Sequence, residues 1–416
     1  MKLVILQDDY PPYHEGGSGV IAEQLAERFS EAGYDVCVIT TVRNASAAGE
    51  TKQNGVRVVR LFADYDVRFR SWVSLYNPFL SKKVKKILQE IKPDIVHVHN
   101  VHHYLSYYAI VLAKRFSKKV FITAHDSMTV YFGKPPFAID AEKKNVQNPN
   151  LFQESLWHQV KLHKIRYNPF RTFAARFIVN TFVDRVVVVS KALGNVLTYN
   201  KLTHISVVHN GIDVERWAEP KDLEKFKEEK HIGESAILYG GRLSEAKGAL
   251  KLLKAFKFVQ EKAPYAQMLI IGKREGVLVE KMLRQAQALG LENNLVFTGW
   301  IDGDKLRSAY YAAALVAVPS LYLDPFPTIN LEAFACGKPV VATCFGGSPE
   351  IVKDAFNGYV VNPNDEEILA RRILNLLNNE SLREEYGKNG RELVISEFTV
   401  EKQFEEYKNL FESFSS

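Results

Sequence analysis

The chain has 416 residues, more than a single ordinary hydrophobic core organises, so two domains are expected. Hydrophobic residues make up 46% of the sequence and charged residues 25%, which is typical of a folded globular protein and excludes a largely disordered chain. The net charge of +6 fits an anionic small molecule, an anionic membrane surface or a nucleic acid, and does not choose among them.

Short apolar runs alternate with helical patterns in the first half of the chain. A strand at residues 3–6 leads through a glycine loop into a helix with Ile21, Leu25 and Phe29 on one face. Further strands are predicted at 36–40, 93–99, 120–124 and 185–189, and a helix at 84–91. This alternation predicts a parallel sheet covered on both faces. Residues 129–173 break the rhythm and indicate an insertion with one or two helices.

The same rhythm restarts after Asn210-Gly211. Strands are predicted at residues 236–239, 267–271, 295–298, 315–318 and 339–342, separated by helices at 248–261, 277–288, 305–313 and 329–335. Helices near 380–397 and at 400–414 end the chain. The charged stretch 215–230 is interpreted as the linker between two successive doubly wound halves.

The cysteines and the apolar runs bear on the cellular compartment. Cys37, Cys336 and Cys344 lie in or beside apolar stretches without a C-x-x-C pair, so they are interpreted as reduced core thiols of a cytoplasmic protein. Residues 1–6 are too short for a signal peptide, and no run of 18 apolar residues predicts a membrane span.

Two cations follow a predicted strand in the second half. The strand ends at Tyr239, two glycines form a turn, and Arg242 and Lys247 precede the next helix. Cations at the carboxyl end of a strand, beside a helix N-terminus, can bind a pyrophosphate. Arginine binds it bidentately, whereas lysine acts as a point charge. Two solvated surface cations are the alternative interpretation.

A second motif runs from Asp324 to Glu332. Pro325 and Pro327 stiffen the loop, and Thr328 is expected to be the N-cap of the next helix, so that its backbone amides can face a ligand. Glu332, one turn inside that helix, can accept hydrogen bonds from two vicinal hydroxyls such as a ribose diol. The alternative interpretation is that Asp324 is a turn residue and that Glu332 lies on a solvated helix face. A third motif, the turn 345–350, would line the same edge of the sheet.

These motifs occur in the order found in family 4 of the nucleotide-sugar glycosyltransferases, which the chain resembles over nearly its whole length. The other members of the set are the glycine loop His14-Glu-Gly-Gly-Ser-Gly19, His125 after a mid-domain strand and the turn Asn210-Gly-Ile-Asp213. The resemblance implies the α/β fold class and the GT-B architecture, in which two Rossmann-like domains with doubly wound parallel sheets face each other across a cleft. The acceptor-side domain would comprise residues 1–213 and about 400–416, with an insertion at about 129–173. The nucleotide-sugar-binding domain would comprise residues 214–399.

The resemblance also implies the roles of particular residues. Arg242 and Lys247 hold the diphosphate and offset the charge that develops on the leaving group. The catalytic set would be His125, Asp324, Arg242 and Lys247. The donor-binding set would be Gly16, Gly17, Arg242, Lys247, Asp324, Phe326, Pro327, Thr328 and Glu332, with Glu332 on the ribose. No metal ligand and no cofactor are expected.

The function implied is retaining transfer of a hexosyl group from a UDP- or GDP-sugar to a glycan or a lipid-linked acceptor. The protein would be cytoplasmic, with a peripheral contact on the inner face of the cell membrane and no nucleic-acid partner. Two alternatives stay open: a nucleotide-sugar epimerase or hydrolase of the same architecture, and a non-catalytic nucleotide-sugar-binding protein. A dehydrogenase is disfavoured because no strand is followed by G-x-G-x-x-G.

The chain departs from the family pattern at three places. The first acid of the signature is Asp324 instead of Glu, and Pro327 replaces a glycine and removes a backbone donor. The turn after the second strand of the C-terminal half is Gly272-Lys-Arg-Glu-Gly276. The first two departures bear on the choice of donor sugar.

Three further features have two interpretations each. Asp64-Tyr-Asp66 resembles a metal-binding Asp-x-Asp but has no supporting ligands nearby in sequence. The histidines at 97, 99, 102 and 103 could hold zinc, or His99 or His102 could lie near an acceptor pocket. The aromatic and basic mixture of the insertion suits an anionic membrane surface or a helical lid packed on the core, and its members are Phe132, Phe137, Trp157, Lys161, Lys164, Arg166 and Arg171.

Overall fold

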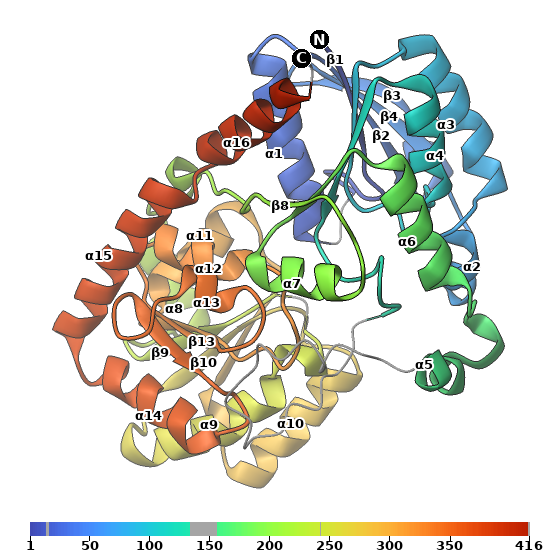
Figure 1. Cartoon of the computed structure of the whole chain (residues 1–416). Helices are drawn as coiled ribbons and strands as arrows, with labels where there is room; N and C mark the ends of the chain where they lie inside the picture. Colours follow the sequence, from blue (N-terminus) through green and yellow to red (C-terminus); the bar gives the residue numbers. More distant parts are fainter. Residues whose placement is uncertain (14–15, 134–155, 242, 415–416) are drawn as a thin grey trace. The chain divides into compact units, whose positions relative to one another are not determined.

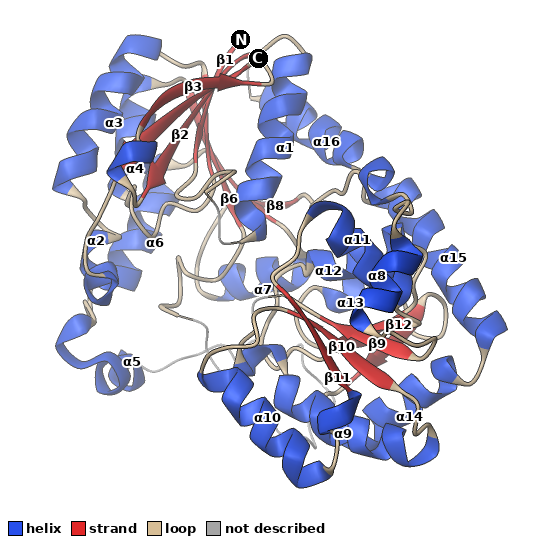
Figure 2. Cartoon of the chain, turned by 180° about the vertical axis from the view of Figure 1, so that it is seen from behind, coloured by secondary structure: helices blue, strands red, loops and turns tan. Residues whose placement is uncertain are grey.

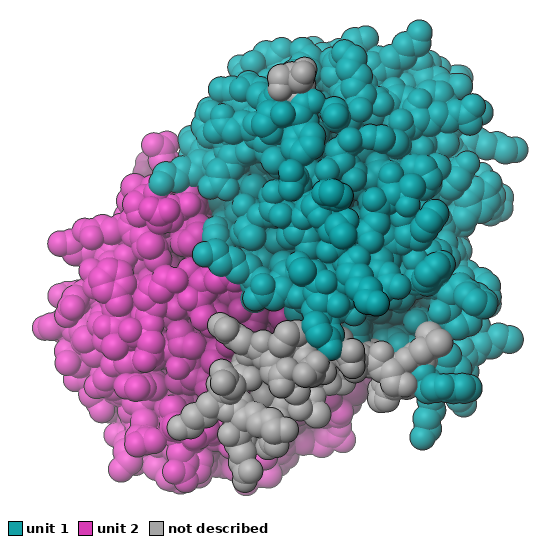
Figure 3. Space-filling view, in the orientation of Figure 1, with its two compact units in different colours: residues 1–135, 149–211, 400–416 teal, residues 136–148, 212–399 magenta. Residues whose placement is uncertain are grey.

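The computed structural model of the chain describes residues 1–13, 16–133, 156–241 and 243–414. Its contacts divide the chain into two compact units (Figure 3). Unit 1 comprises residues 1–135, 149–211 and 400–416, and unit 2 comprises residues 136–148 and 212–399. No helix in the described ranges is long and apolar enough to cross a membrane.

Unit 1 is built on an eight-stranded sheet with the order β3-β4-β2-β1-β5-β6-β7-β8. Every neighbouring pair is parallel except β3 with β4, which is antiparallel at one edge. The strands are β1 (Lys2–Leu6), β2 (Asp35–Val42), β3 (Gly49–Gln53), β4 (Val56–Phe62), β5 (Ile95–Val98), β6 (Lys119–Ala124), β7 (Arg185–Val188) and β8 (Ile205–Val207). The predicted parallel sheet is confirmed apart from this edge, where β3 was not predicted because all of its residues are exposed and leave no apolar signal. β4 and β8 were not predicted either.

The helices of unit 1 cover both faces of this sheet (Figure 2). They are α1 (Gly17–Glu31), α2 (Arg70–Val73), α3 (Pro78–Ile91), α4 (Tyr108–Phe116), α5 (Leu156–His163), α6 (Arg171–Phe182), α7 (Lys191–Tyr199) and α16 (Val400–Ser413). The predicted apolar face of α1 is confirmed, since Ile21, Leu25 and Phe29 are buried. Phe29 stacks on Phe411 of α16 with ring centroids 5.3 Å apart, so the end of the chain completes the core of unit 1.

α6 corrects one expectation about the insertion. It begins at Arg171 and leads directly into β7, so it is the ordinary crossover helix between the parallel strands β6 and β7. The insertion therefore ends before this helix. Most of the remainder, residues 134–155, lies outside the described residues, and Phe137 lies there with it.

Unit 2 contains a six-stranded, entirely parallel sheet with the order β11-β10-β9-β12-β13-β14. Its strands are β9 (Ala236–Tyr239), β10 (Gln267–Ile271), β11 (Leu295–Gly299), β12 (Leu315–Val318), β13 (Val340–Thr343) and β14 (Gly358–Val361). Its helices are α8 (Leu223–Lys230), α9 (Ala249–Lys262), α10 (Val277–Leu289), α11 (Gly303–Ala312), α12 (Thr328–Ala335), α13 (Ser348–Ile351), α14 (Glu366–Leu377) and α15 (Glu380–Glu397). The strands and helices predicted for this half are confirmed, whereas β14, α13 and α14 were not predicted.

The stretch 215–230 is not a linker. It forms a 3-10 turn, η5 (Val214–Trp217), and then α8, both within unit 2. Phe226 is buried, and the Trp217 ring lies edge-on to Tyr310 at 5.2 Å. Its high charge misled the interpretation, because one apolar side chain per turn was enough to attach this short helix.

The strand order of unit 2 places a switch point between β9 and β12. From β9 the chain winds outward through β10 and β11, and from β12 it winds the other way through β13 and β14. In such open parallel sheets the loops that leave the carboxyl ends of the two switch strands diverge and form a crevice. The loop after β9 carries Lys247, and the loop after β12 carries Asp324.

Candidate functional site

The two switch-point loops of unit 2 are tied to each other through their backbones. The amide of Leu321 donates to the carbonyl oxygen of Ala246 at 2.7 Å. Gly248 has φ +80°, and a Cβ there would lie 1.9 Å from the carbonyl oxygen of Pro319. Only glycine allows this approach, so the loop after β9 is held directly against the loop after β12.

An ion pair links the side chains of the same loops. Lys247 Nζ lies 2.5 Å from Asp324 Oδ2, and Ser320 Oγ donates to that oxygen at 3.2 Å. The Lys247 ammonium also lies 5.4 Å from the centre of the Tyr322 ring. Asp324 is buried and Lys247 is largely buried, so the pair is shielded from solvent. The structure thus brings together two of the residues predicted from separate motifs.

The environment of Lys247 keeps its amine charged. Burial by itself lowers the pKa of Lys247, but the neighbouring Asp324 carboxylate and the Tyr322 hydroxyl outweigh it, so the pKa is raised above its ordinary value. Burial and the negative charge of Asp324 raise the pKa of Tyr322 in turn. The site therefore holds a permanent, poorly hydrated cation with a single carboxylate as its counter-ion.

The glycine turn after β13 presses on the backbone of the Asp324 loop. A Cβ on Gly346, whose φ is +66°, would lie 2.2 Å from the carbonyl oxygen of Asp324. A Cβ on Gly347 would lie 2.1 Å from the carbonyl oxygen of Pro325, and the Gly347 amide donates to Asp324 O at 2.8 Å. The third sequence motif, the turn 345–350, thus fixes the loop of the second motif.

Glu332 lies on α12 behind this loop and is not the solvated residue of the alternative interpretation. The buried Tyr310 hydroxyl hydrogen-bonds to Glu332 Oε2, and the Thr328 side chain one turn earlier hydrogen-bonds to the same carboxylate. Burial raises the pKa of Glu332, and both hydrogen bonds oppose that shift. The carboxylate of Glu332 is thus held in a fixed orientation and has limited access to solvent.

The remaining predicted residues of unit 2 have different outcomes. Pro327, not Thr328, is the N-cap of α12, and Thr328 is the first helical residue, so the predicted cap was wrong. The Thr328 side chain instead bonds to Glu332. Phe326 is buried, with its ring 5.7 Å from that of Phe398. Arg242 lies outside the described residues.

In unit 1 the predicted glycines lie at the start of α1. Gly16 is its N-cap and Gly17 its first residue, and a Cβ on either would meet no atom within 4 Å. Gln7 Nε2 donates to Ser18 Oγ at 3.2 Å, and Asn100 Nδ2 donates to the same hydroxyl at 3.0 Å. The start of α1 is therefore fixed by β1 and by the loop after β5, with open space over the two glycines.

His125 follows β6 and belongs to a cluster of histidines. His125 Nε2 lies 2.8 Å from His99 Nδ1, and His97 Nε2 lies 2.7 Å from Thr123 Oγ1. The His97 and His99 rings stand 4.2 Å apart. His97 and His99, at the end of β5, thus lie close to His125. They pair with one another and with hydroxyls, and no group of three or more His, Cys, Asp or Glu among the described residues could hold a metal ion.

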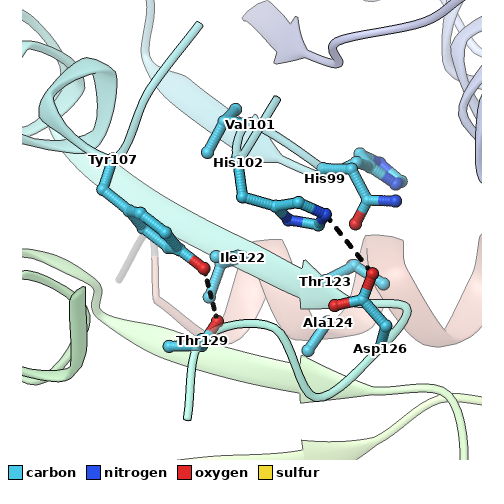
Figure 4. Close-up of a pocket in the computed structure, with 10 residues that line it drawn as sticks. His99, Val101, His102, Tyr107, Ile122, Thr123, Ala124, Asp126 and Thr129 are labelled. Carbon is cyan, nitrogen blue, oxygen red and sulfur yellow. Dashed lines mark hydrogen bonds and ion pairs between the residues drawn. The ribbon is translucent and has the colours of Figure 1, made fainter. Parts of the chain in front are cut away.

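A small pocket opens beside this cluster (Figure 4). It is lined by His99, His102, Tyr107, Asp126 and Thr129, together with short stretches of β6 and of the loop after β5. His102 Nε2 points at Asp126 Oδ2 across 3.4 Å, and the Tyr107 hydroxyl lies 3.1 Å from Thr129 Oγ1. The lining of the pocket is mixed, with the polar groups of His102, Asp126, Tyr107 and Thr129 beside apolar Val101 and Ile122.

Two organising residues were not predicted from the sequence. The carboxylate of Asp8 accepts hydrogen bonds from the backbone amides of His103, Tyr104 and Leu105, at 2.6 to 2.9 Å. It thereby fixes the loop after β5 next to the histidine cluster. Tyr310, the hydrogen-bond partner of Glu332, is 22 positions away in sequence. Asp8 and Tyr310 both act through contacts with residues distant in sequence, which a local sequence pattern does not reveal.

Gly346→Ala tests how tightly the glycine turn and the Asp324 loop fit together. We expect it to lower the free energy of unfolding by about 3 kcal/mol or more, because the left-handed backbone is strained and the new methyl meets main-chain atoms. Gly290→Ala is the matched control, since Gly290 has φ +68° and no atom within 4 Å of a Cβ. It should lose only about 1 kcal/mol in the same urea titration. Equal losses would contradict the fit.

The histidine cluster should make the stability of unit 1 depend on pH. Burial lowers the pKa of His97 to about 3 and that of His125 to about 4, below the ordinary 6.5. Below pH 6.5 these histidines bind protons in the unfolded chain but not in the folded chain, so their contribution to the free energy of unfolding falls as the pH falls.

His97→Gln should reduce this slope between pH 6 and pH 5 by up to about 1.4 kcal/mol per pH unit, measured by urea unfolding. The exposed His231 provides the control variant, His231→Gln, which should leave the slope as it is. An unchanged slope in His97→Gln would show that His97 is protonated in the folded protein.

The chain matches two family profiles that together span nearly all of it. Residues 15–216 match the profile described as Glycosyltransferase Family 4, and residues 220–393 match Glycosyl transferases group 1. An uncharacterized glycosyltransferase of Methanocaldococcus jannaschii is 26% identical, over 99% of this chain and 98% of its own. The N-acetyl-alpha-D-glucosaminyl L-malate synthase of Bacillus anthracis is also 26% identical, over 99% of this chain and 97% of its own.

Solved structures agree on the fold. The sucrose-phosphate synthase of Thermosynechococcus elongatus superposes with a TM-score of 0.77 at 21% identity, covering 99% of this chain and 98% of that one. HepE of Anabaena, in complex with UDP and glucose, superposes with a TM-score of 0.74 at 19% identity, covering 99% and 100%. Two parallel-sheet α/β units, the ordered motifs and both profiles place the chain in the family 4, group 1 glycosyltransferases of GT-B architecture.

Proposed function

We propose that the chain moves a hexosyl group from a UDP- or GDP-sugar to a glycan or a lipid-linked acceptor, with retention of configuration and without a metal. The observation that carries the proposal is the shielded Lys247–Asp324 pair at the switch point of unit 2. Ligands of open parallel sheets bind at such a point. A cation kept out of water there acts strongly on a nearby phosphate, because its charge is poorly screened.

Lys247 would supply the electrostatic part of the reaction. When the bond to the sugar breaks, negative charge develops on the nucleoside diphosphate, and a preorganised cation stabilises it without reorganising. Lys247 is held by both loops and remains charged, as described above. Arg242 is proposed as the second cation on the basis of the family pattern. Two such cations could replace the metal ion that other phosphate-transferring sites use.

Glu332 would hold the ribose of the donor. Its carboxylate is already oriented by Tyr310 and Thr328, and a carboxylate can accept further hydrogen bonds from two adjacent hydroxyls. Its position on α12, directly after the Asp324 loop, supports binding of the ribose and of the sugar by neighbouring residues of one motif. The backbone of Phe326, Pro327 and Thr328 would lie nearest the hexose.

Asp324 would exchange partners when the donor binds. In the structure its carboxylate neutralises Lys247, so a diphosphate has to take the ammonium from it. The carboxylate would then be free to accept a hydrogen bond from a hydroxyl of the hexose. Because Asp is one methylene shorter than Glu and is tied to Ser320, this hydroxyl would have to approach close to the loop.

Unit 1 would supply the acceptor side, together with Gly16, Gly17 and His125 as further contacts of the donor. The open space over the glycines and the neutral, partly exposed His125 support these roles. HepE binds UDP-glucose, which supports a UDP-sugar as donor. A lipopolysaccharide 1,2-N-acetylglucosaminetransferase of Salmonella typhimurium, 31% identical over half of this chain, supports a glycan acceptor. A cytoplasmic location with peripheral membrane contact completes the proposal.

The first test is nucleotide release from a panel of UDP- and GDP-sugars, with and without candidate acceptors. Lys247→Ala should lower kcat/KM by about 10²–10³, the scale for losing one donor of positive charge to a transition state. Lys251→Ala is the matched control, since Lys251 is also ion-paired, to Glu366 at 3.0 Å, but lies inside α9. It should keep full activity.

The panel also separates the alternatives. Release that does not increase with any acceptor would indicate a hydrolase. Binding of a nucleotide sugar without any release would indicate a non-catalytic binding protein. Equal activities of Lys247→Ala and Lys251→Ala would refute the role of Lys247.

Asp324→Asn separates binding from turnover. It removes the counter-ion that competes with the diphosphate for Lys247, so we expect the Kd for UDP to stay the same or to fall, by up to about tenfold. Turnover should nevertheless fall, since the amide is a weaker acceptor for the hexose hydroxyl. Calorimetry with UDP and steady-state kinetics measure the two effects. A weaker UDP complex with unchanged kcat would contradict this role of Asp324.

A further inference from the structure

Large apolar side chains are exposed together on unit 1. We call the set the apolar face, and it comprises Phe69, Trp72, Ile165, Phe170, Phe173 and Phe177. Their exposed fractions run from 47% for Trp72 to 86% for Ile165. Single exposed apolar residues are normal on a protein surface, but a group of this size usually marks a site of contact.

The elements that carry the apolar face are joined by hydrogen bonds. They are η2 (Val67–Phe69), α2, η4 (Lys164–Arg166) and α6. Ser71 Oγ donates to the carbonyl oxygen of Arg166 at 2.8 Å, and Arg171 Nε donates to Ser74 Oγ at 3.0 Å. Figures 1 and 2 both show α2 beside the first turn of α6. The segments are therefore adjacent in the fold, although they are about 95 residues apart in sequence, as Ser71 and Arg166 are.

The outer side of α6 carries apolar side chains where polar ones are expected. Ala175 and Val179 are buried, as expected for the inner side of a crossover helix. Phe170, Phe173 and Phe177, spaced three and four residues apart, share the opposite side, where a surface helix normally carries polar residues. Arg171, for which a membrane surface was one of two interpretations, is fully buried and donates to Met128 O at 2.7 Å. It braces the helix from within.

The segments that bear the apolar face carry cations and no acids. Residues 67–77, which include η2 and α2, contain two Arg residues, residues 156–182 contain five Lys or Arg residues, and neither stretch contains Asp or Glu. Lys164 and Arg166 are exposed on either side of Ile165 in sequence, and Lys161 is exposed on the preceding helix α5. The nearest acid before the first stretch is Asp66, which is ion-paired with Arg68. Apolar rings bordered by cations are the composition of a surface that binds an anionic bilayer interface.

We propose that the apolar face and its exposed cations seat unit 1 on an anionic lipid bilayer. The aromatic rings enter the headgroup region, and Lys161, Lys164 and Arg166 contact the anionic headgroups. A second copy of the chain is a poorer occupant, because a symmetric contact would bring these cations against each other. The biological role of this contact rests on the proposed function, since docking of the acceptor-side unit on a bilayer would bring it close to a lipid-linked acceptor. The contact itself needs neither donor nor acceptor.

The test is sedimentation of the full chain with lipid vesicles, in the absence of nucleotide sugar. We expect binding to phosphatidylcholine vesicles that contain phosphatidylglycerol, and much weaker binding to phosphatidylcholine alone. Phe173→Ser/Phe177→Ser should weaken the partition by at least about tenfold. Lys161→Gln/Lys164→Gln should weaken it by about 10- to 30-fold and reduce its sensitivity to salt.

The matched controls lie on unit 2, where isolated residues of the same types are exposed. Phe258 and Tyr265 are 42% and 69% exposed, and Lys254 and Lys262 are exposed as well. Phe258→Ser/Tyr265→Ser and Lys254→Gln/Lys262→Gln should leave the partition unchanged. Equal losses in the controls, or binding that ignores phosphatidylglycerol, would overturn the proposal.

Two further measurements separate other occupants and the proposed function. Self-association that disappears in Phe173→Ser/Phe177→Ser, without vesicle binding, would assign the face to a second copy and overturn the proposal. Nucleotide release with a water-soluble acceptor should be the same in wild type and in both unit 1 variants. Nucleotide release without vesicle binding would refute the membrane docking and leave the proposed transferase function intact. Vesicle binding without nucleotide release would refute the transferase function and leave the membrane docking intact.

Discussion

The contact between Lys247 and Asp324 is the constraint on which the candidate site depends. An ammonium acts strongly on a phosphate only where water is scarce, yet a buried ammonium without a partner is unstable. Asp324 resolves this conflict by neutralising Lys247 at 2.5 Å in the structure. Removing one partner of such a pair typically costs about 3–5 kcal/mol. The ion pair therefore contributes to the stability of the two loops as well as to the proposed chemistry.

The backbone around this pair is fixed by glycines instead of by side chains. Gly248 allows the loop after β9 to reach Pro319, and Gly346 and Gly347 allow the turn after β13 to reach the Asp324 loop. Each approach leaves no room for a Cβ. Three segments from three strand ends thus meet main chain to main chain, which explains why short glycine motifs spaced about a hundred residues apart belong to one site.

The fold was largely predictable, because its signal is local. Short continuous apolar runs and amphipathic helices gave most strands of both sheets, whereas β3, β4, β8 and β14 were not predicted. β3 is entirely exposed, and α8 is attached by Phe226 alone. The site was predictable only as a set of motifs. That Lys247 pairs with Asp324, that Tyr310 binds Glu332, and that Asp8 fixes the loop after β5 depend on contacts between distant segments, which no local pattern encodes.

The modest net charge of the chain hides a strong segregation. Two acid-free stretches, residues 67–89 and 156–182, carry eleven of the 54 Lys and Arg residues, which exceeds the net charge of +6. The remainder of the chain is therefore net negative. The distribution of cations in sequence does not by itself give the surface, because Arg171 is buried whereas its neighbour Phe170 is exposed. Reversing the usual placement of these two residue types is unfavourable in water, unless the exposed rings have an apolar phase to enter and the surrounding cations have anions to meet.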